Sequence, residues 1–298
     1  MPLRYWAIIL VLAAGWGSSF FFNEILLREL HPLWVGAGRV TTGALGCWLW
    51  LGLRGQARLV PVTVIGHLVV FGLLQYGLPL TIFPLSQQYI TSSAAGIINA
   101  MTPIMVVLVS HFWPGGERAT LLKSFGVASG FFGIVLLAVP SLQGGGESAP
   151  LALAFALLAP LSYGLALNYL RIFDGMDRTL LTAWALLVGA SVMVPIAATA
   201  TGAPQISQAE TWVALGVIGF VLTAAAFIIL FWLIPKVGST AASTVTFIAP
   251  VAALLLGVLV LEETVLPIQY AGLAAIFGGL VFIDGRLFRW SRKDQPLG

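Results

Sequence analysis

The chain has 298 residues, of which 59% are hydrophobic and only 8% are charged. Soluble domains carry roughly 25% charged residues, so this composition excludes an ordinary water-facing surface and indicates an integral membrane protein. The formal net charge of +3 gives no reason to expect a nucleic-acid partner, and a single cysteine excludes an intrachain disulfide.

Charged residues and turn residues divide the chain into stretches of membrane-spanning length. A helix that crosses the hydrocarbon core needs about 20 apolar residues. Between Arg58 and Glu117 there is no Asp, Glu, Lys or Arg, yet one helix of that length would far exceed the bilayer, so we predict a turn at 87–93. The expected fold is all-α, with ten transmembrane helices at residues 5–27, 33–53, 62–86, 91–113, 120–139, 149–170, 179–201, 211–233, 239–261 and 266–287.

The loops between these helices differ in their basic residues. With ten helices, Arg28 falls on one side of the membrane. The opposite side holds Arg4, Arg54, Arg58, Arg118, Lys123, Arg171, Arg178, Lys236, Arg286, Arg289, Arg292 and Lys293. Cytoplasmic loops are enriched in Lys and Arg, so the pattern predicts a multi-pass protein of the cytoplasmic (inner) membrane with both termini in the cytoplasm.

The second half of the chain repeats features of the first. Residues 92–95 (Ser-Ser-Ala-Ala) recur as 239–242 (Ser-Thr-Ala-Ala), and Pro103 then aligns with Pro250 without a gap. Further pairs in the same order are Asn23 with Asn168, Glu117 with Glu263, Gly126 with Gly272, Phe131 with Phe277 and Gly133 with Gly279. With five helices in each half, 1–143 and 144–298, the second half would enter the membrane inverted. Inverted repeats around a central cavity are typical of secondary transporters.

These residues resemble the EamA family of the drug/metabolite transporter superfamily. The likeness lies in residues 16–20 (Trp-Gly-Ser-Ser-Phe), in Pro32 followed by Arg39, and in the small-residue entry to the helix that contains Pro103. It continues through 116–118 (Gly-Glu-Arg) and, in the second half, through Glu262 and Glu263. The resemblance implies a central cavity bounded mainly by helices 1–4 and 6–9, with helices 5 and 10 as scaffold. It also implies export of amino acids or other metabolites.

Arg39 is the one basic residue expected well inside a helix, roughly 9 Å from its outer end. An ionisable residue at that depth is costly and is a candidate functional residue. Its guanidinium could bind a carboxylate of the substrate. The alternative, which the sequence favours, is a structural ion pair with Glu24, which lies toward the same side at the end of the first helix. Both interpretations stay open at the level of the sequence.

The remaining candidates are polar or aromatic side chains expected near the middle of the membrane, where they need partners or water. Such residues line a cavity or bond between helices, and the sequence does not separate the two. With Arg39, the candidate substrate-binding residues are Trp16, Ser19, Asn23, Gln75, Tyr76, Asn99, Thr102, Tyr163 and Thr246. Pro103 and Pro250, which interrupt backbone hydrogen bonding beside polar faces, are candidate hinges of a gate.

Other classes of function have little support in the sequence. There is no Gly-rich phosphate loop with Lys and Ser/Thr, and acids and histidines lack the spacing of a metal site or a catalytic triad. We therefore expect no enzyme activity, cofactor or metal. The leading hypothesis is an exporter of small metabolites, most of all amino acids, that works by alternating access as a monomer or homodimer. The alternatives are efflux of lipophilic cations by proton antiport and a non-transporting membrane scaffold or sensor.

Overall fold

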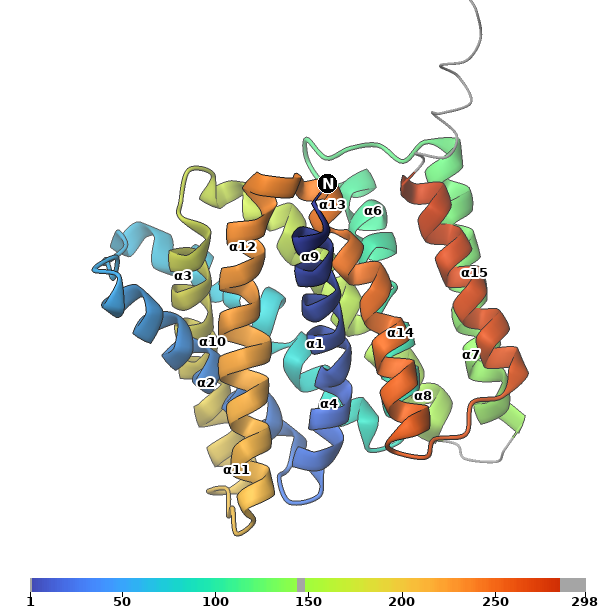
Figure 1. Cartoon of the computed structure of the whole chain (residues 1–298), viewed down its shortest axis with the longest axis horizontal. Coiled ribbons are helices and arrows are strands. Elements are labelled where there is room, and N and C mark those ends of the chain that lie inside the picture. Colours follow the sequence, from blue (N-terminus) through green and yellow to red (C-terminus); the bar gives the residue numbers. More distant parts are fainter. Residues whose placement is uncertain (1, 144–147, 285–298) are drawn as a thin grey trace, which may run out of the picture.

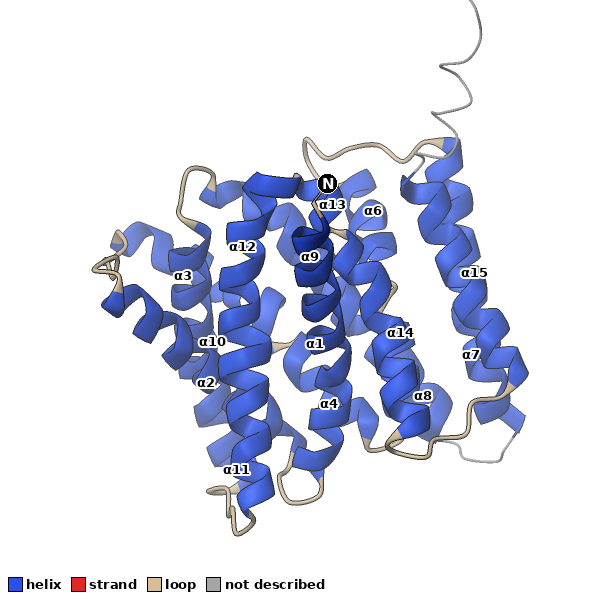
Figure 2. Ribbon diagram, viewed as in Figure 1, coloured by secondary structure: helices blue, strands red, loops and turns tan. Residues whose placement is uncertain are grey.

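The structure, a computed structural model, describes residues 2–143 and 148–284. Within these two ranges every regular element is a helix and no strand occurs (Figure 2). The helices are α1 (Leu3–Leu27), α2 (Pro32–Leu53), α3 (Val62–Gly72), η1 (Leu73–Gly77), α4 (Pro79–Gln87), α5 (Ser92–Asn99), α6 (Thr102–Phe112), α7 (Leu121–Gln143), α8 (Ser148–Ala156), α9 (Leu158–Tyr169), η2 (Leu170–Phe173), α10 (Arg178–Thr201), α11 (Ala209–Gly216), η3 (Val217–Ala225), α12 (Ala226–Val237), α13 (Ser239–Ala242), α14 (Thr244–Leu259) and α15 (Pro267–Asp284).

Several of these helices join into longer apolar runs. Seven runs among the described residues are long and apolar enough to cross a membrane: Leu3–Leu27, Val62–Gln87, Ser92–Phe112, Leu121–Pro140, Ala149–Phe173, Arg178–Thr201 and Ala209–Val237. Thr244–Leu259 and Pro267–Ile283 are shorter apolar helices. The all-helical membrane architecture expected from composition is therefore confirmed, and the number of crossings stays a prediction.

Proline explains two interruptions that the sequence analysis did not place. The expected helix 91–113 breaks after Asn99, and the expected helix 149–170 breaks after Ala156. Each break ends four residues before a proline, Pro103 and Pro160, whose ring collides with the carbonyl at that position and whose nitrogen has no proton to donate. Pro250, by contrast, lies inside α14, and the interruption nearest to it is at Ser243. The two candidate hinge prolines thus have different local structures.

Side-chain caps mark the turns between helices. His31 accepts a hydrogen bond from the Leu33 amide at the start of α2, Thr91 accepts one from Ala94 at the start of α5, and Asp177 accepts one from Leu180 at the start of α10. The turn predicted at 87–93 is therefore present between α4 and α5. The glycine run 144–146 and the basic residues from Arg286 onward lie outside the described residues.

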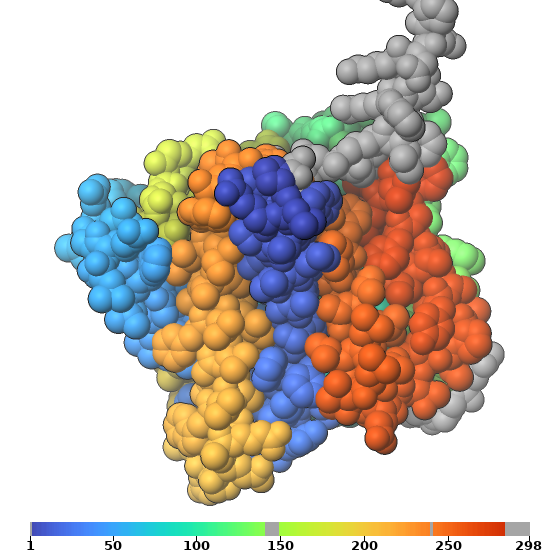
Figure 3. All heavy atoms as spheres, in the orientation of Figure 1, coloured from blue at the N-terminus to red at the C-terminus, as the bar shows by residue number. Residues whose placement is uncertain are grey.

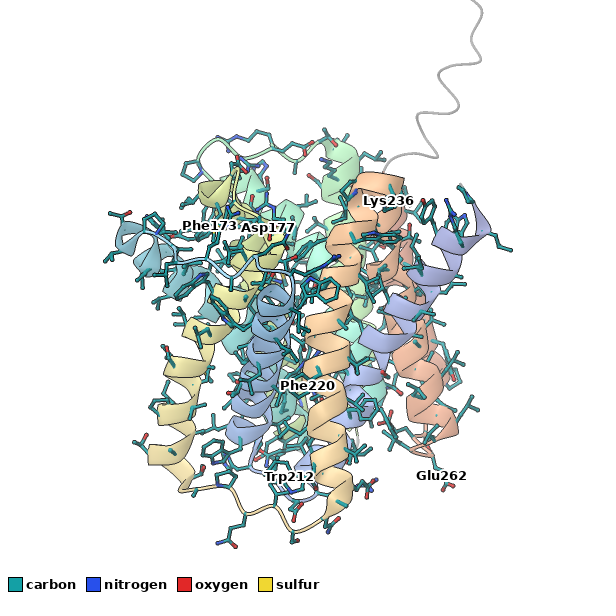
Figure 4. The ribbon with its side chains drawn as sticks, turned by 60° about the vertical axis from the view of Figure 1, so that its left-hand side comes forward. Phe173, Asp177, Trp212, Phe220, Lys236 and Glu262 are labelled. Carbon is teal, nitrogen blue, oxygen red and sulfur yellow. The ribbon has the colours of Figure 1, made fainter. Side chains whose placement is uncertain are left out.

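The helices lie side by side with their connections gathered at two ends (Figure 1). The chain begins at one end, called here the N-terminal end, and the connections after α6, η2 and α12 lie there too. The turns after α1, α4, α10 and α14 lie at the opposite end, called here the Glu263 end. Phe173, Asp177 and Lys236 lie at the N-terminal end, whereas Trp212 and Glu262 lie at the other (Figure 4).

Close packing fixes two features of this bundle. On one face α1 lies between the α11–α12 run and α14 (Figure 3). At the right of Figure 1, α7 packs along α15, where glycine lets backbones touch. A Cβ on Gly126 would lie 2.5 Å from the Gly279 carbonyl, and one on Gly133 would lie 2.5 Å from the Gly272 carbonyl. These glycines therefore serve packing within the chain.

Candidate functional site

One cavity brings the candidate residues together. It has a volume of about 550 Å³, within the range of small-molecule sites. All ten candidate binding residues line it: Trp16, Ser19, Asn23, Arg39, Gln75, Tyr76, Asn99, Thr102, Tyr163 and Thr246. Pro103 and Pro250 are not among the lining residues. The lining continues through Leu170, Arg178 and Pro235, at helix ends on the N-terminal side, so the cavity extends from the middle of the bundle toward that end.

Arg39 is buried on the cavity wall, and its hydrogen-bond partners among the described residues are hydroxyl groups. Its Nε donates to Thr223 Oγ1 at 3.1 Å, and its Nη2 donates to Ser19 Oγ at 3.1 Å. The ion pairs formed by described residues, Arg28–Glu210, Lys123–Glu117 and Arg178–Asp174, do not include it. The expected ion pair with Glu24 is therefore not formed.

Helix geometry explains the missing ion pair. Ser19 and Asn23 are four residues apart and face the cavity together, whereas Glu24 is turned about 100° away from Asn23 around α1. Glu24 instead lies close enough to Glu263 and Arg28 to interact with them electrostatically. A buried guanidinium without a carboxylate retains unused hydrogen-bonding capacity for an anionic partner.

Aromatic rings form an apolar wall of the cavity. Phe227 packs against Trp16 with ring centroids 5.3 Å apart and against Tyr76 with centroids 5.5 Å apart. Tyr76 also lies 6.3 Å from Phe71. The polar atoms of Trp16 and Tyr76 form hydrogen bonds to neighbouring helices. Trp16 Nε1 donates to the Leu222 carbonyl, and the Tyr76 hydroxyl donates to Thr182 Oγ1. The rings thus present apolar faces to a ligand.

Two π-helical segments contribute to the site. Gln75 and Tyr76 come from η1, and Thr223 comes from η3. The wide turns of a π-helix leave carbonyls without their usual helical partners, and such segments occur frequently at functional sites. Here the Leu222 carbonyl of η3 accepts from Trp16, and the Leu74 carbonyl of η1 accepts from Ser162. Gln75 Oε1 is buried and has no hydrogen-bond partner among the described residues.

The chain matches the sequence profile of a known protein family. A profile described as "EamA-like transporter family" matches residues 4–139 and 150–284. The chain belongs to the EamA-like transporter family. The resemblance read from the residue patterns is therefore confirmed.

Several curated relatives are named as transporters, and the likeness covers most of their length. The chain is 24% identical to the uncharacterized transporter YoaV of Bacillus subtilis over 84% of this chain and 86% of YoaV. It is 24% identical to protein PecM of Dickeya dadantii over 95% and 93% of the two chains, and 25% identical to the uncharacterized inner membrane transporter YedA of Escherichia coli over 90% and 86%. Together with the apolar helices, these likenesses make the chain a multi-pass membrane transporter.

The EamA-like fold is also seen in a solved crystal structure. That protein aligns with a TM-score of 0.66 and 18% sequence identity, covering 96% of this chain and 98% of its own. At this identity the likeness concerns the fold alone.

The cavity of this EamA-like protein is closed toward the Glu263 end by a polar network. Asn23 Nδ2 donates to Gln87 Oε1 at 2.8 Å, and Gln87 Nε2 donates to the Phe20 carbonyl at 2.9 Å and to Ser92 Oγ at 3.0 Å. Ser92 Oγ in turn donates to the Phe20 carbonyl. Asn23, Gln87 and Ser92 are all buried, so α1, α4 and α5 are tied together beneath the cavity.

The structure adds site residues that the sequence analysis missed. Thr223 holds Arg39, Phe227 links two aromatic rings, and Gln87 closes the cavity floor. Thr223 lies in the middle of the expected helix 211–233, so the criterion that selected Gln75 could have found it. Gln87 was placed in a loop, because it begins the polar run that marks the turn. Nothing in its local sequence signals that its side chain points into the bundle.

Proposed function

We propose that this EamA-like transporter exports small metabolites that carry a carboxylate, with amino acids as the first substrates to test. The observation that supports this proposal is Arg39, a buried cation on the cavity wall with hydroxyl partners and no ion pair among the described residues. A guanidinium can bind a carboxylate through two parallel hydrogen bonds. The aromatic wall would hold an apolar side chain of the same substrate.

The charges on the cavity wall favour this substrate class over lipophilic cations. The charged residues that line the cavity are Arg39 and Arg178, and no Asp or Glu of the described ranges 2–143 and 148–284 lines it. A cationic drug entering this space would meet like charge in surroundings where water screens poorly. The open volume and the unpartnered Gln75 Oε1 also favour transport over a scaffold role, since a scaffold would be expected to fill its interior and pair its polar groups.

We further propose that transport proceeds by alternating access of two inverted five-helix halves, 1–143 and 144–298. Paired contacts support this arrangement. Trp16 bonds a π-helix carbonyl of the second half, and Ser162, at nearly the corresponding position, bonds a π-helix carbonyl of the first. The repeat aligns Gly126 with Gly272 and Gly133 with Gly279. In the structure the contacts are crossed, because Gly126 packs against Gly279 and Gly133 packs against Gly272. Such exchange of partners is what a pseudo-two-fold axis between the halves would produce.

The same proposal assigns the N-terminal end of the bundle to the cytoplasm. The loops expected to hold most basic residues gather there, and Lys236 is seen at that end. In this orientation the cavity would face the cytoplasm, from which an exporter takes its substrate.

Counterflow in proteoliposomes would test the substrate class. Vesicles preloaded with an unlabelled amino acid should accumulate the labelled form, and the corresponding methyl ester, which lacks the carboxylate, should not compete. Arg39→Gln should lower the rate by about 100-fold, because the anion would lose its charged partner in a buried site. Arg54→Gln, at an exposed arginine directly after α2, the helix that contains Arg39, is the matched control and should leave the rate unchanged. Equal competition by acid and ester would overturn the proposal.

A further inference from the structure

The loop between α14 and α15 makes an unusual contact with the other half of the chain. Glu263 accepts hydrogen bonds from two consecutive backbone amides at the start of α5, from Ser92 to Oε1 at 2.7 Å and from Ser93 to Oε2 at 2.9 Å. The first amides of a helix lack partners within the helix and carry its partial positive charge. A carboxylate that takes two of them makes charge-assisted bonds of the stronger kind.

This contact lies directly below the floor of the cavity. Ser92, whose amide binds Glu263, also uses its hydroxyl in the network of Gln87 and the Phe20 carbonyl. The carboxylate therefore joins the end of α14 to the same residue that ties α4, α5 and α1 together. A path from the cavity to the Glu263 end that runs beside α5 would open by separating α5 from one or more of these neighbours.

Gly257 makes room for this arrangement. The Glu263 amide donates to the Gly257 carbonyl at 2.9 Å, so the chain after α14 folds back on the helix end. A Cβ on Gly257 would collide with Ser93 Oγ and with Glu263 Oε2. Both obstacles are ends of flexible side chains, so an added methyl group would displace the carboxylate without disturbing a backbone.

A neighbouring charge opposes the contact. Glu24, in α1, is close enough to Glu263 for the two carboxylates to repel each other, and Arg28 partly offsets this charge. Like charge beside these strong hydrogen bonds lowers the cost of breaking them, which suits a contact that has to open and close.

We propose that Glu263 is the positioning residue that latches the gate at the Glu263 end, holding α5 against α14 in the state seen here and releasing it when the cavity opens there. This role rests on the proposed alternating access. Glu263 would affect transport only through the gate, because it does not line the cavity.

Thiol labelling can test the latch without any substrate. Cys47, which is buried, would be replaced by Ala, and Ala249→Cys would place one thiol on the cavity wall. A membrane-impermeant maleimide added at the Glu263 side should label this protein slowly. With Glu263→Gln, one amide loses its acceptor because an amide side chain has a single acceptor oxygen, and labelling from that side should rise about tenfold.

Matched variants separate the latch from general disruption. Glu262→Gln changes the exposed neighbouring carboxylate and should not alter labelling. Gly257→Ala should reproduce the effect of Glu263→Gln by a steric route, whereas Gly66→Ala, where a methyl group meets nothing within 4 Å, should not.

Two outcomes decide the question. Faster labelling from the Glu263 side in Glu263→Gln and Gly257→Ala supports the latch, and if the first variant does not fold, the second decides alone. Unchanged labelling in the folded variants overturns the latch but leaves the counterflow result, and hence the proposed substrate class, untouched.

Discussion

The loops that contain Glu117 and Glu263 occupy aligned positions in the two halves and make different contacts. Each loop folds back on the preceding helix, as the Glu117 amide donates to Ser110 Oγ and the Glu263 amide donates to the Gly257 carbonyl. The Glu263 carboxylate then crosses to α5, whereas the Glu117 carboxylate binds Lys123 on the following helix of its own half. Similar local sequence therefore produces similar loops, and the tertiary arrangement determines which of the two carboxylates reaches the other half of the chain.

The largest change in stability should come from a substitution at the contact between α7 and α15. The glycines of this contact lie outside the loops that contain Glu117 and Glu263. Gly126→Val would force a β-carbon against the Gly279 carbonyl and the Ile283 backbone, and we expect a loss of about 3 kcal/mol in unfolding free energy. Thermal unfolding in detergent would measure it. Gly278→Val is the control, because the nearest atom to its added Cβ is 4.0 Å away. A Gly126→Val variant as stable as this control would contradict the packing described here.

The next largest effect should come from replacing Gln87. Loss of its side chain would weaken the contacts at the Glu263 end of the cavity and make the two ends of the bundle more alike. Gln87→Leu deletes three hydrogen bonds of a buried side chain and leaves Asn23 and Ser92 without this partner. Losing buried partners of this kind costs about 2 kcal/mol, which corresponds to roughly a 30-fold shift toward opening at the Glu263 end. The labelling assay above would detect this shift. Gln88→Leu changes the exposed neighbouring glutamine and should leave labelling at the original rate.

A smaller effect is expected at Glu29, which joins two loops at the Glu263 end. The hydroxyls of Ser207 and Thr211 and the amides of Ser207 and Gln208 donate to its carboxylate and lower its pKa to about 2. A lowered pKa in the folded state stabilises the protein above about pH 4.3, the usual pKa of Glu, and this contribution is lost as the pH falls toward 2.

Glu29→Gln should therefore lower the unfolding temperature by about 2–3 °C at pH 7, and the difference from the unsubstituted protein should disappear near pH 2. Glu210→Gln, which removes the exposed ion pair with Arg28, should change the unfolding temperature less. A difference that grows as the pH falls would show that the hydrogen bonds assigned to Glu29 are wrong.

The smallest change in stability should follow from removing the ion-pair partner of Glu117. Its ion pair with Lys123 is largely exposed on the Glu117 side, with 71% of that side chain accessible, so Lys123→Met should cost less than about 1 kcal/mol of stability. Labelling from the Glu263 side should not change. A change as large as that caused by Glu263→Gln would mean that the two loops are coupled in the state described here.

Much of the architecture could be predicted from the sequence, because the membrane allows few kinds of secondary structure. Apolar stretches of spanning length must be helical, since the hydrocarbon core offers no partner for backbone groups. The expected helices therefore begin and end within a few residues of the observed ones, as at Pro32–Leu53 and Arg178–Thr201. Polar residues placed at mid-membrane by the same criterion, such as Gln75 and Tyr163, lie together on one cavity wall because they also have to avoid lipid.

The sequence by itself determined the membrane environment, the helical segments, the family and a set of polar residues that share one cavity. The tertiary structure alone decided what those residues contact. It placed Ser19 and Thr223, rather than Glu24, beside Arg39, and it brought Glu263 to the start of α5 from 170 residues away. The physical reason is that helix propensity and hydrophobicity act locally along the chain. The partners of a buried charge or of a helix end depend on which helices pack together, and that follows from contacts between distant segments such as α2 with η3 and α5 with α14.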